Sequence, residues 1–176
     1  MAITVFKSLL PLLVLSSVLA GCGLTQKVAD GTVSTTKAIF YKQVKTLHLD
    51  FNARHASNNN PQGEPLATVV RVYQLRERRA FDTADYQQLS DVDSQVLKAD
   101  LLDQRDLRVQ PNGSAVLDIP LDPQAKHVAV MALFLSPEIA QNSWRVVLDR
   151  ADLDPDKPRV IELRSRQVQL KPLNKE

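Results

Sequence analysis

The sequence predicts a mainly β protein, a two-sheet antiparallel β-sandwich with a small helical insertion. Two observations support this prediction. Apolar and polar residues alternate along seven or eight short segments at roughly regular spacing, which is the pattern of half-buried strands. Between the second and third segments the spacing becomes helical instead. The chain of 176 residues is long enough to bury the core that such a sandwich needs.

The first strand is expected from Val44 onward, because apolar and polar residues alternate there. Its buried positions are expected to be Leu47, Leu49, Phe51 and Ala53. A polar stretch follows from Arg54 to Pro65, with three consecutive asparagines, two prolines and a glycine. Because it contains no large apolar residue and many turn formers, it is expected to be an exposed loop. It is long for a hairpin connection, and long ordered loops are often functional.

The second strand is expected at Leu66–Leu75, which is rich in β-branched and aromatic residues. Asp82 is expected to cap a short helix over Thr83–Leu89, because an aspartate side chain accepts hydrogen bonds from the first N–H groups of a helix. Asp93 is expected to cap another short helical turn that runs to Leu101. These two helices form the predicted insertion.

The second half of the chain is expected to return to strands. Val128–Leu135 is continuously apolar, as expected for a central strand buried on both faces, and it is too short to span a membrane. Trp144 lies on an alternating segment and is expected in the core. The other strands are expected near Leu107–Val109, Val116–Leu121, Trp144–Leu148, Ile161–Leu163 and Val168–Leu170, with a turn at Pro111-Asn112-Gly113 and a polar loop at Asp149–Pro158.

Residues 1–21 are expected to be a lipoprotein signal peptide rather than part of the fold. Their one charged side chain is Lys7, and the apolar run from Ser8 to Ala20 is shorter than the about 20 residues of a membrane helix. The run ends at Leu19-Ala20-Gly21-Cys22, which matches the lipobox of bacterial lipoproteins. That match implies that Cys22 is acylated and becomes the first residue after cleavage. A buried free cysteine, the alternative, would not explain why the apolar run ends here.

The rest of the chain is expected to form two parts. Residues 22–43 are expected to be a lipidated tether that is partly helical, and residues 44–176 the β-sandwich domain. Gly23, rather than an aspartate, follows the cysteine, and by resemblance to enterobacterial sorting rules this favours the outer membrane. We therefore expect a protein anchored in the outer membrane by its lipid, with its domain facing the periplasm.

The sequence offers few residues for catalysis or metal binding. Its single cysteine excludes a disulfide framework and a multi-cysteine metal site, and no two of its three histidines lie within four residues of each other. The aspartates of Asp152–Asp156 resemble the start of a calcium loop, but Lys157 and Leu163 replace the required glycine and glutamate. With 22 basic and 20 acidic residues, the chain lacks the basic excess of nucleic-acid-binding proteins. No enzymatic activity, metal or cofactor is expected, apart from the lipid on Cys22.

Several blocks of the sequence resemble one known family. They are Val69-Val70-Arg71-Val72-Tyr73-Gln74-Leu75-Arg76, Ala80-Phe81, Ala84-Asp85-Tyr86 and Ser143-Trp144-Arg145. Together with the lipobox, they resemble the outer-membrane lipoprotein of the bacterial type VI secretion system, the TssJ family, also called SciN or VasD. The resemblance covers nearly all of the chain after Cys22. One departure is Asn112, which separates a proline and a glycine that are commonly adjacent in the family. This one-residue insertion affects only a turn.

The resemblance implies a transthyretin-like β-sandwich with a helical addition and no catalysis. It also implies an adaptor that binds the periplasmic C-terminal region of the large IcmF-like inner-membrane subunit, TssM. In the family this contact involves the loop between the first two strands, which is Arg54–Pro65 here. The residues expected to bind the partner are Arg54, His55, Ser57, Asn58, Asn59, Asn60, Pro61, Gln62, Gly63 and Glu64. Such a polar loop is expected to bind through hydrogen bonds, with little apolar burial.

An alternative function is a periplasmic lipoprotein that acts on or binds cell-wall carbohydrate. That function would require two carboxyl groups that converge beside a groove. Their surroundings would shift their pKa values, as at other acid–base sites. The sequence alone leaves this alternative open, because it does not show which carboxylates meet in space.

Overall fold

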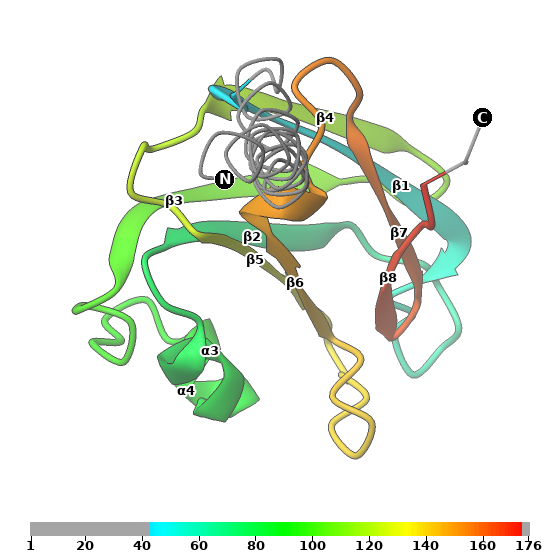
Figure 1. Ribbon diagram of the computed structural model, residues 1–176. Helices are drawn as coiled ribbons and strands as arrows, with labels where there is room; N and C mark the ends of the chain where they lie inside the picture. The colour runs from blue at the N-terminus through cyan, green and yellow to red at the C-terminus, as the bar shows by residue number, and fades with distance from the viewer. Residues whose placement is uncertain (1–42, 174–176) are drawn as a thin grey trace, which may run out of the picture. The chain divides into compact units, whose positions relative to one another are not determined.

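The computed structural model describes residues 43–173, and two four-stranded sheets make up most of this part (Figure 1). The strands are β1 (Thr46–Ser57), β2 (Thr68–Leu75), β3 (Leu101–Val109), β4 (Ser114–Pro120), β5 (His127–Leu133), β6 (Arg145–Asp149), β7 (Arg159–Ser165) and β8 (Gln167–Leu170). One sheet has the order β4-β1-β7-β8, and the other β3-β2-β5-β6. The expected signal peptide, the acylated Cys22 and the tether up to residue 42 lie outside the described residues. Within residues 43–173, no helix is both long enough and apolar enough to cross a bilayer.

The predicted two-sheet sandwich is confirmed, but its sheets are not antiparallel throughout. β1 and β7 run parallel, with Leu49 opposite Arg159 and Ala53 opposite Leu163, whereas the other paired strands of the described region are antiparallel. Parallel neighbours need a crossover connection instead of a tight turn. Between β1 and β7 the chain forms β2 and β3 of the other sheet, returns to form β4, and then forms β5 and β6 of the other sheet. Alternation could not predict this pairing, because side chains alternate in the same way in both kinds of sheet.

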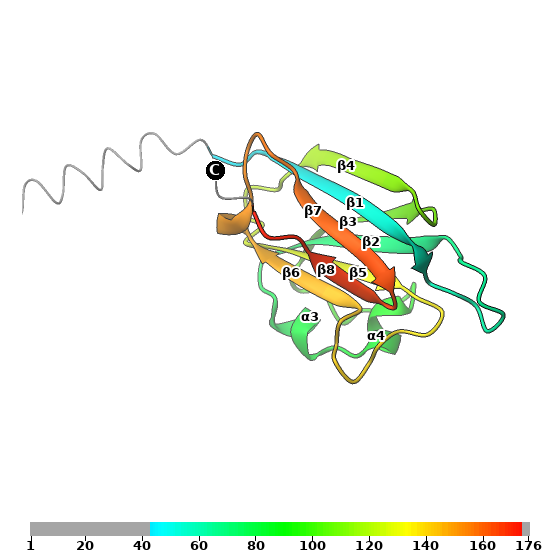
Figure 2. The ribbon, with the colours of Figure 1, turned by 90° about the vertical axis from the view of Figure 1, so that its right-hand side faces the viewer.

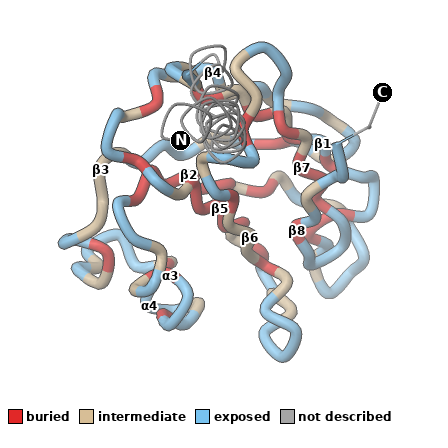
Figure 3. Tube along the Cα trace, viewed as in Figure 1, coloured by how far each residue is buried: buried red, intermediate tan, exposed pale blue. Residues whose placement is uncertain are grey.

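The core lies between the two sheets and includes the inward face of β1. Leu47, Leu49 and Phe51 are fully buried, as the alternation predicted. β5 is buried along its whole middle. β2 and β6 flank it within the sheet, the core covers one of its faces, and the helical insertion lies on the other side of the sheet. The predicted central strand is therefore confirmed, and buried positions follow the inner strands in Figure 3. Full burial of each large apolar side chain contributes about 1.5–3 kcal/mol to stability.

Two short helices, α3 (Arg79–Thr83) and α4 (Tyr86–Ser90), lie on the outer side of the second sheet (Figure 2). The insertion was expected here, but its capping residue differs. Asp82 lies inside α3, and Asp85 caps α4 instead: its carboxylate accepts from the Gln88 amide (2.7 Å), and the Gln88 side-chain oxygen accepts from the Asp85 amide (3.0 Å). The expected single helix is divided because the backbone between α3 and α4 is extended.

No regular helix follows Asp93, although one helical hydrogen bond forms, from the Leu101 amide to the Leu97 carbonyl oxygen (2.8 Å). Residues 91–100 make a series of turns, and β3 begins at Leu101, opposite Leu75 of β2. Pairing with β2 places Leu101 in the sheet.

Arg145, at the start of β6, fastens the helical insertion to the sheet. Its guanidinium donates to the carbonyl oxygens of Phe81 (2.5 Å), Ala84 (2.8 Å) and Asp82 (2.9 Å). It also lies over the rings of Trp144 and Phe81, 4.6 and 5.5 Å from their centroids. Burial lowers the pKa of Arg145, and the nearby charge of Asp82 opposes that shift. Trp144 is 1% exposed, which confirms that it belongs to the core.

We predict that Arg145→Ala lowers the free energy of unfolding by about 2–4 kcal/mol, because three carbonyl oxygens lose a charged donor. Arg145→Lys keeps the charge but not the planar fork, so its loss should be smaller. Urea denaturation followed by circular dichroism measures both. Arg105→Ala is the matched control, since that exposed side chain pairs with its near neighbour Asp103. Equal losses in the two alanine variants would contradict the role of Arg145.

Candidate functional site

The candidate site is the connection between β1 and β2, which the sequence predicted at Arg54–Pro65. The start of that range is wrong, because β1 continues to Ser57 and so includes Arg54 and His55. The strand extends this far because its pairing with β7 resumes after an irregularity, with Ser57 opposite Ser165. The connection itself comprises residues 58–67, and it projects beyond the ends of the sheets in Figure 2.

The residues predicted to bind a partner fall into three groups. Ser57 and Asn58 are buried, at 0% and 5% exposure, so their side chains are not on the surface. Arg54 and His55 are exposed on the last part of β1. Residues 59–64 form a mostly exposed hairpin that extends from the domain.

The tip of the hairpin is a tight turn organised by Asn60. Its side-chain oxygen accepts hydrogen bonds from the amides of Gln62 (3.0 Å) and Glu64 (2.8 Å), and its carbonyl oxygen accepts from the Gly63 amide (2.9 Å). Gly63 has a φ of 84°, a left-handed conformation that glycine adopts without steric cost. Pro61 restricts φ at the first corner of the turn. The exposed side chains of the tip therefore project from a well-defined backbone.

Asn58 links three segments that are distant in the sequence. Its amide donates to the carbonyl of Ser165, the last residue of β7 (2.6 Å), and its own carbonyl accepts from the Leu66 amide (3.2 Å). Its side chain donates to the Ala67 carbonyl (3.2 Å) and accepts from the Leu135 amide, just after β5 (2.7 Å). A φ of 54° allows these bonds, and asparagine tolerates this left-handed region better than most residues. Asn58 therefore holds the hairpin against the end of β7 and the connection after β5.

Exposed apolar side chains lie at the base of the hairpin and in the connection that follows β5. Leu66 and Leu135, whose amides both bond to that asparagine, are 37% and 57% exposed. Ile139 follows in the same connection after β5 and is 55% exposed. We call residues 59–66 together with residues 135–139 the loop surface. It combines a polar tip with apolar side chains, a composition typical of protein interfaces.

The sequence prediction missed Leu135 because it included this residue in the central strand Val128–Leu135. The strand β5 ends at Leu133 instead. Ser136-Pro137 was the available signal, since a residue before proline is restricted and proline often ends regular structure. Exposure of Leu135 could not be read from the pattern, because an apolar residue at the end of a buried run looks like part of that run.

Basic side chains border the loop surface. Arg54 of β1 and Arg164 of β7 both donate to the buried carboxylate of Glu162, each at 2.6 Å. Burial by itself would raise the pKa of Glu162, but these two hydrogen bonds outweigh burial and lower it. Arg166, in the β7–β8 turn, lies 3.5 Å from Glu138. Two arginines share one carboxylate here, so this border carries a local positive charge.

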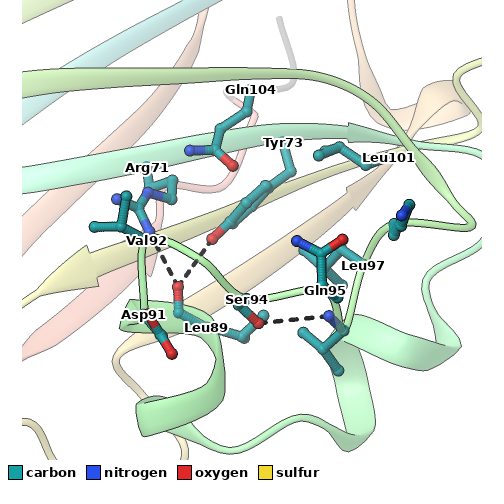
Figure 4. Close-up of a pocket in the computed structure, with 12 residues that line it drawn as sticks. Arg71, Tyr73, Leu89, Asp91, Val92, Ser94, Gln95, Leu97, Leu101 and Gln104 are labelled. Atoms are coloured by element: carbon teal, nitrogen blue, oxygen red, sulfur yellow. Dashed lines mark hydrogen bonds between the residues drawn. The ribbon is translucent and has the colours of Figure 1, made fainter.

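A separate pocket lies between the second sheet and the turns that follow α4. In Figure 4 the side chains of Arg71 and Tyr73 both point toward the Leu89 carbonyl oxygen, to which they donate at 3.1 and 3.3 Å. Asp106 holds the other side of the Arg71 guanidinium at 2.9 Å, and this bond raises the pKa of Arg71. Arg71 and Tyr73 therefore hold α4 against β2 through these hydrogen bonds.

This pocket does not meet the requirement of the carbohydrate alternative. Asp91 is the one carboxylate in its lining, and it is exposed. Among residues 43–173 the one buried carboxylate is Glu162, in the other sheet, where two arginines neutralise it. The described part of the chain also contains no cluster of three or more histidine, cysteine, aspartate or glutamate side chains placed to hold a metal ion.

Comparison with protein families gives one match to the domain. The family model described as "Type VI secretion lipoprotein, VasD, EvfM, TssJ" matches residues 45–170. Among curated proteins, no sequence matches the chain.

Solved structures contain similar chains. One, in a structure described as "T6SS protein TssM C-terminal domain (869-1107) from EAEC", is 47% identical with a TM-score of 0.69; the match covers 74% of this chain and 100% of that chain. Another, in a structure described as "Type VI membrane complex", is 49% identical with a TM-score of 0.71 and the same coverage. The T6SS lipoprotein TssJ1 from Pseudomonas aeruginosa is 23% identical with a TM-score of 0.60, covering 73% of this chain and 97% of its own, and shares the fold.

We predict that Asn58→Ala lowers the free energy of unfolding by about 2–3 kcal/mol, because a buried donor and acceptor lose their partners and alanine is strained at this φ. Asn58→Gly keeps the backbone conformation and so isolates the lost side-chain bonds. Hydrogen exchange at the Leu135 amide should accelerate in both variants. Asn59→Ala, in the exposed neighbour, is the control. Unchanged exchange at Leu135 in the glycine variant would show that Asn58 does not hold this connection.

Proposed function

The chain belongs to the type VI secretion lipoprotein family, and we propose that it is the lipid-anchored outer-membrane adaptor of the type VI secretion membrane complex. In this role it binds the periplasmic C-terminal region of TssM, the IcmF-like inner-membrane subunit. The loop surface and the basic residues beside it form the binding site. The chain thereby connects the outer membrane to the inner-membrane part of the machine.

The observation that carries the proposal is the size of the chain matched in the TssM structure. The match covers 74% of 176 residues, about 130 residues, and all of the matched chain. The TssM region 869–1107 is much longer, at 1107 − 868 = 239 residues. The matched chain is therefore too short to be that region and is best explained as its companion in the same structure. At 47% identity, this supports the same pairing for the present chain.

The loop surface suits a protein partner more than a small ligand. The hairpin tip offers polar groups, while Leu66, Leu135 and Ile139 offer apolar area that is exposed in the domain. This modifies the expectation of a contact with little apolar burial, because a partner would also bury these three side chains. The positive border at Arg54 and Arg164 favours an acidic rim on the partner, since complementary charge increases association rate and specificity.

We predict that Leu135→Asp weakens binding of the purified TssM C-terminal region about tenfold or more, because it places a charge in the apolar part of the contact. Biolayer interferometry with the acylated chain in neutral detergent measures the change. Val116→Asp is the matched control, because Val116 is 64% exposed on β4, away from the loop surface. If both substitutions weakened binding equally, or if neither weakened it, the interface would lie elsewhere.

Deleting the hairpin is a less selective experiment than a point substitution. A deletion from Ser57 to Gly63 removes Asn58, so it would also release the connection that contains Leu135. Loss of binding would then not distinguish the hairpin from the apolar residues beside it. Ile139→Asp provides the second point variant, and circular dichroism checks that each variant keeps the fold.

The anchor has its own test. We predict that Cys22→Ser leaves uncleaved precursor and removes the protein from the outer-membrane fraction, because no acyl chains can be attached. Sucrose-gradient fractionation with immunoblotting measures this. The purified variant should still bind TssM with unchanged affinity, since the loop surface is intact. Retention of Cys22→Ser in the outer membrane would contradict lipid anchoring while leaving the TssM interaction untouched.

A further inference from the structure

A basic cavity of about 420 Å³ lies where β7 begins and β8 ends. Lys157, Arg159 and Lys171 are the charged residues of its lining. Lys157 has an interaction partner of its own, so the positive charge of the cavity comes mainly from Arg159 and Lys171. The carboxylate of Asp154, in the loop before β7, accepts hydrogen bonds from the backbone amides of Asp156 and Lys157. A positive cavity of this kind attracts anions.

Arg159 gives the cavity a buried charge that has no counter-ion among residues 43–173. It is 5% exposed, and its terminal nitrogens donate to the carbonyl oxygens of Asp152 (2.6 Å) and Lys171 (3.4 Å). Its Nε is buried and has no acceptor within residues 43–173. Arg71, the other buried arginine of the described chain, has the carboxylate of Asp106 at 2.9 Å. An unpaired buried charge is costly, so a bound anion would stabilise this arrangement.

The cavity lies at the end of the domain opposite the loop surface. Arg159 begins β7 and pairs with Leu49 near the start of β1, whereas Ser165 ends β7 opposite Ser57 at the end of β1. The described chain also starts, at Gln43, on the side of the cavity (Figure 2). The cavity is therefore at the end where the chain enters the domain from its N-terminal part.

We propose that this cavity binds a phosphate group, and that in the cell the phosphate belongs to the headgroup of a membrane lipid. Arginine and lysine are the residues that bind phosphate oxygens best, through charge-assisted hydrogen bonds. The phosphate site depends only on residues 157–173. Its assignment to a lipid rests on the anchor at Cys22, part of the proposed function, which would keep this end of the domain attached to a membrane. The contact would orient the domain with its loop surface away from that membrane.

The test uses the acylated full chain, labelled with ¹⁵N, in neutral dodecyl maltoside micelles. Inorganic phosphate is added in one series and sodium chloride at matched ionic strength in another, and amide shifts of residues 157–173 are followed. We expect saturable shifts with phosphate only. Lys171→Gln should raise the dissociation constant about three- to fivefold, the usual contribution of one exposed charge pair. Lys98→Gln removes one positive charge outside the cavity and should leave the dissociation constant for phosphate unchanged.

A second series replaces phosphate by micelles that contain phosphatidylglycerol. The same amides should shift, and the lipid should compete with inorganic phosphate. Equal shifts with chloride and phosphate, or equal effects of Lys171→Gln and Lys98→Gln, would overturn the phosphate site. Phosphate binding without any response to phosphatidylglycerol would overturn the lipid source alone. Lys171→Gln should bind TssM with unchanged affinity. The phosphate titration therefore tests the cavity, and TssM binding separately tests the loop surface.

Discussion

Packing of β1 against the facing sheet is the interaction on which the rest of the domain depends. β1 lies between β4 and β7 in its own sheet, and its fully buried Leu47, Leu49 and Phe51 contribute to the core between the sheets. The same strand carries the hairpin at its end. Burial of its inward face therefore determines both the position of the sheets and the place from which the loop surface projects.

The parallel pairing of β1 with β7 gives the domain two structurally different ends. At one end, the start of both strands brings Arg159 and its basic cavity close to the entry of the chain. At the other end, Asn58 gathers the hairpin, the end of β7 and the connection after β5. A membrane contact at the first end and a protein contact at the second are compatible, because a strand of twelve residues separates them.

The sequence predicted correctly those strands and buried residues that depend on the polarity of neighbouring residues in the chain. Alternation along β1, the apolar run of β5 and the burial of Trp144 all follow from which side chains avoid water. It failed at boundaries that distant residues decide. Arg54 and His55 look like the start of a polar loop, yet pairing with β7 extends the strand through them. Leu101 looks like the end of a helix, yet pairing with β2 makes it the start of β3.

The sequence by itself determined the number and order of most strands, the position of the hairpin and the family, because these depend on periodicity and on contiguous motifs. Only the tertiary structure decided which loop residues are available to a partner. Asn58 and Asn59 are identical neighbours in the chain, but only Asn58 is buried, where a left-handed backbone brings it to Ser165 and Leu135. Likewise, Arg71 and Arg159 are both buried arginines. The fold places the carboxylate of Asp106 beside Arg71, whereas Arg159 has no carboxylate beside it in the described part of the chain. Such differences arise from contacts between residues far apart in the chain, which no local pattern records.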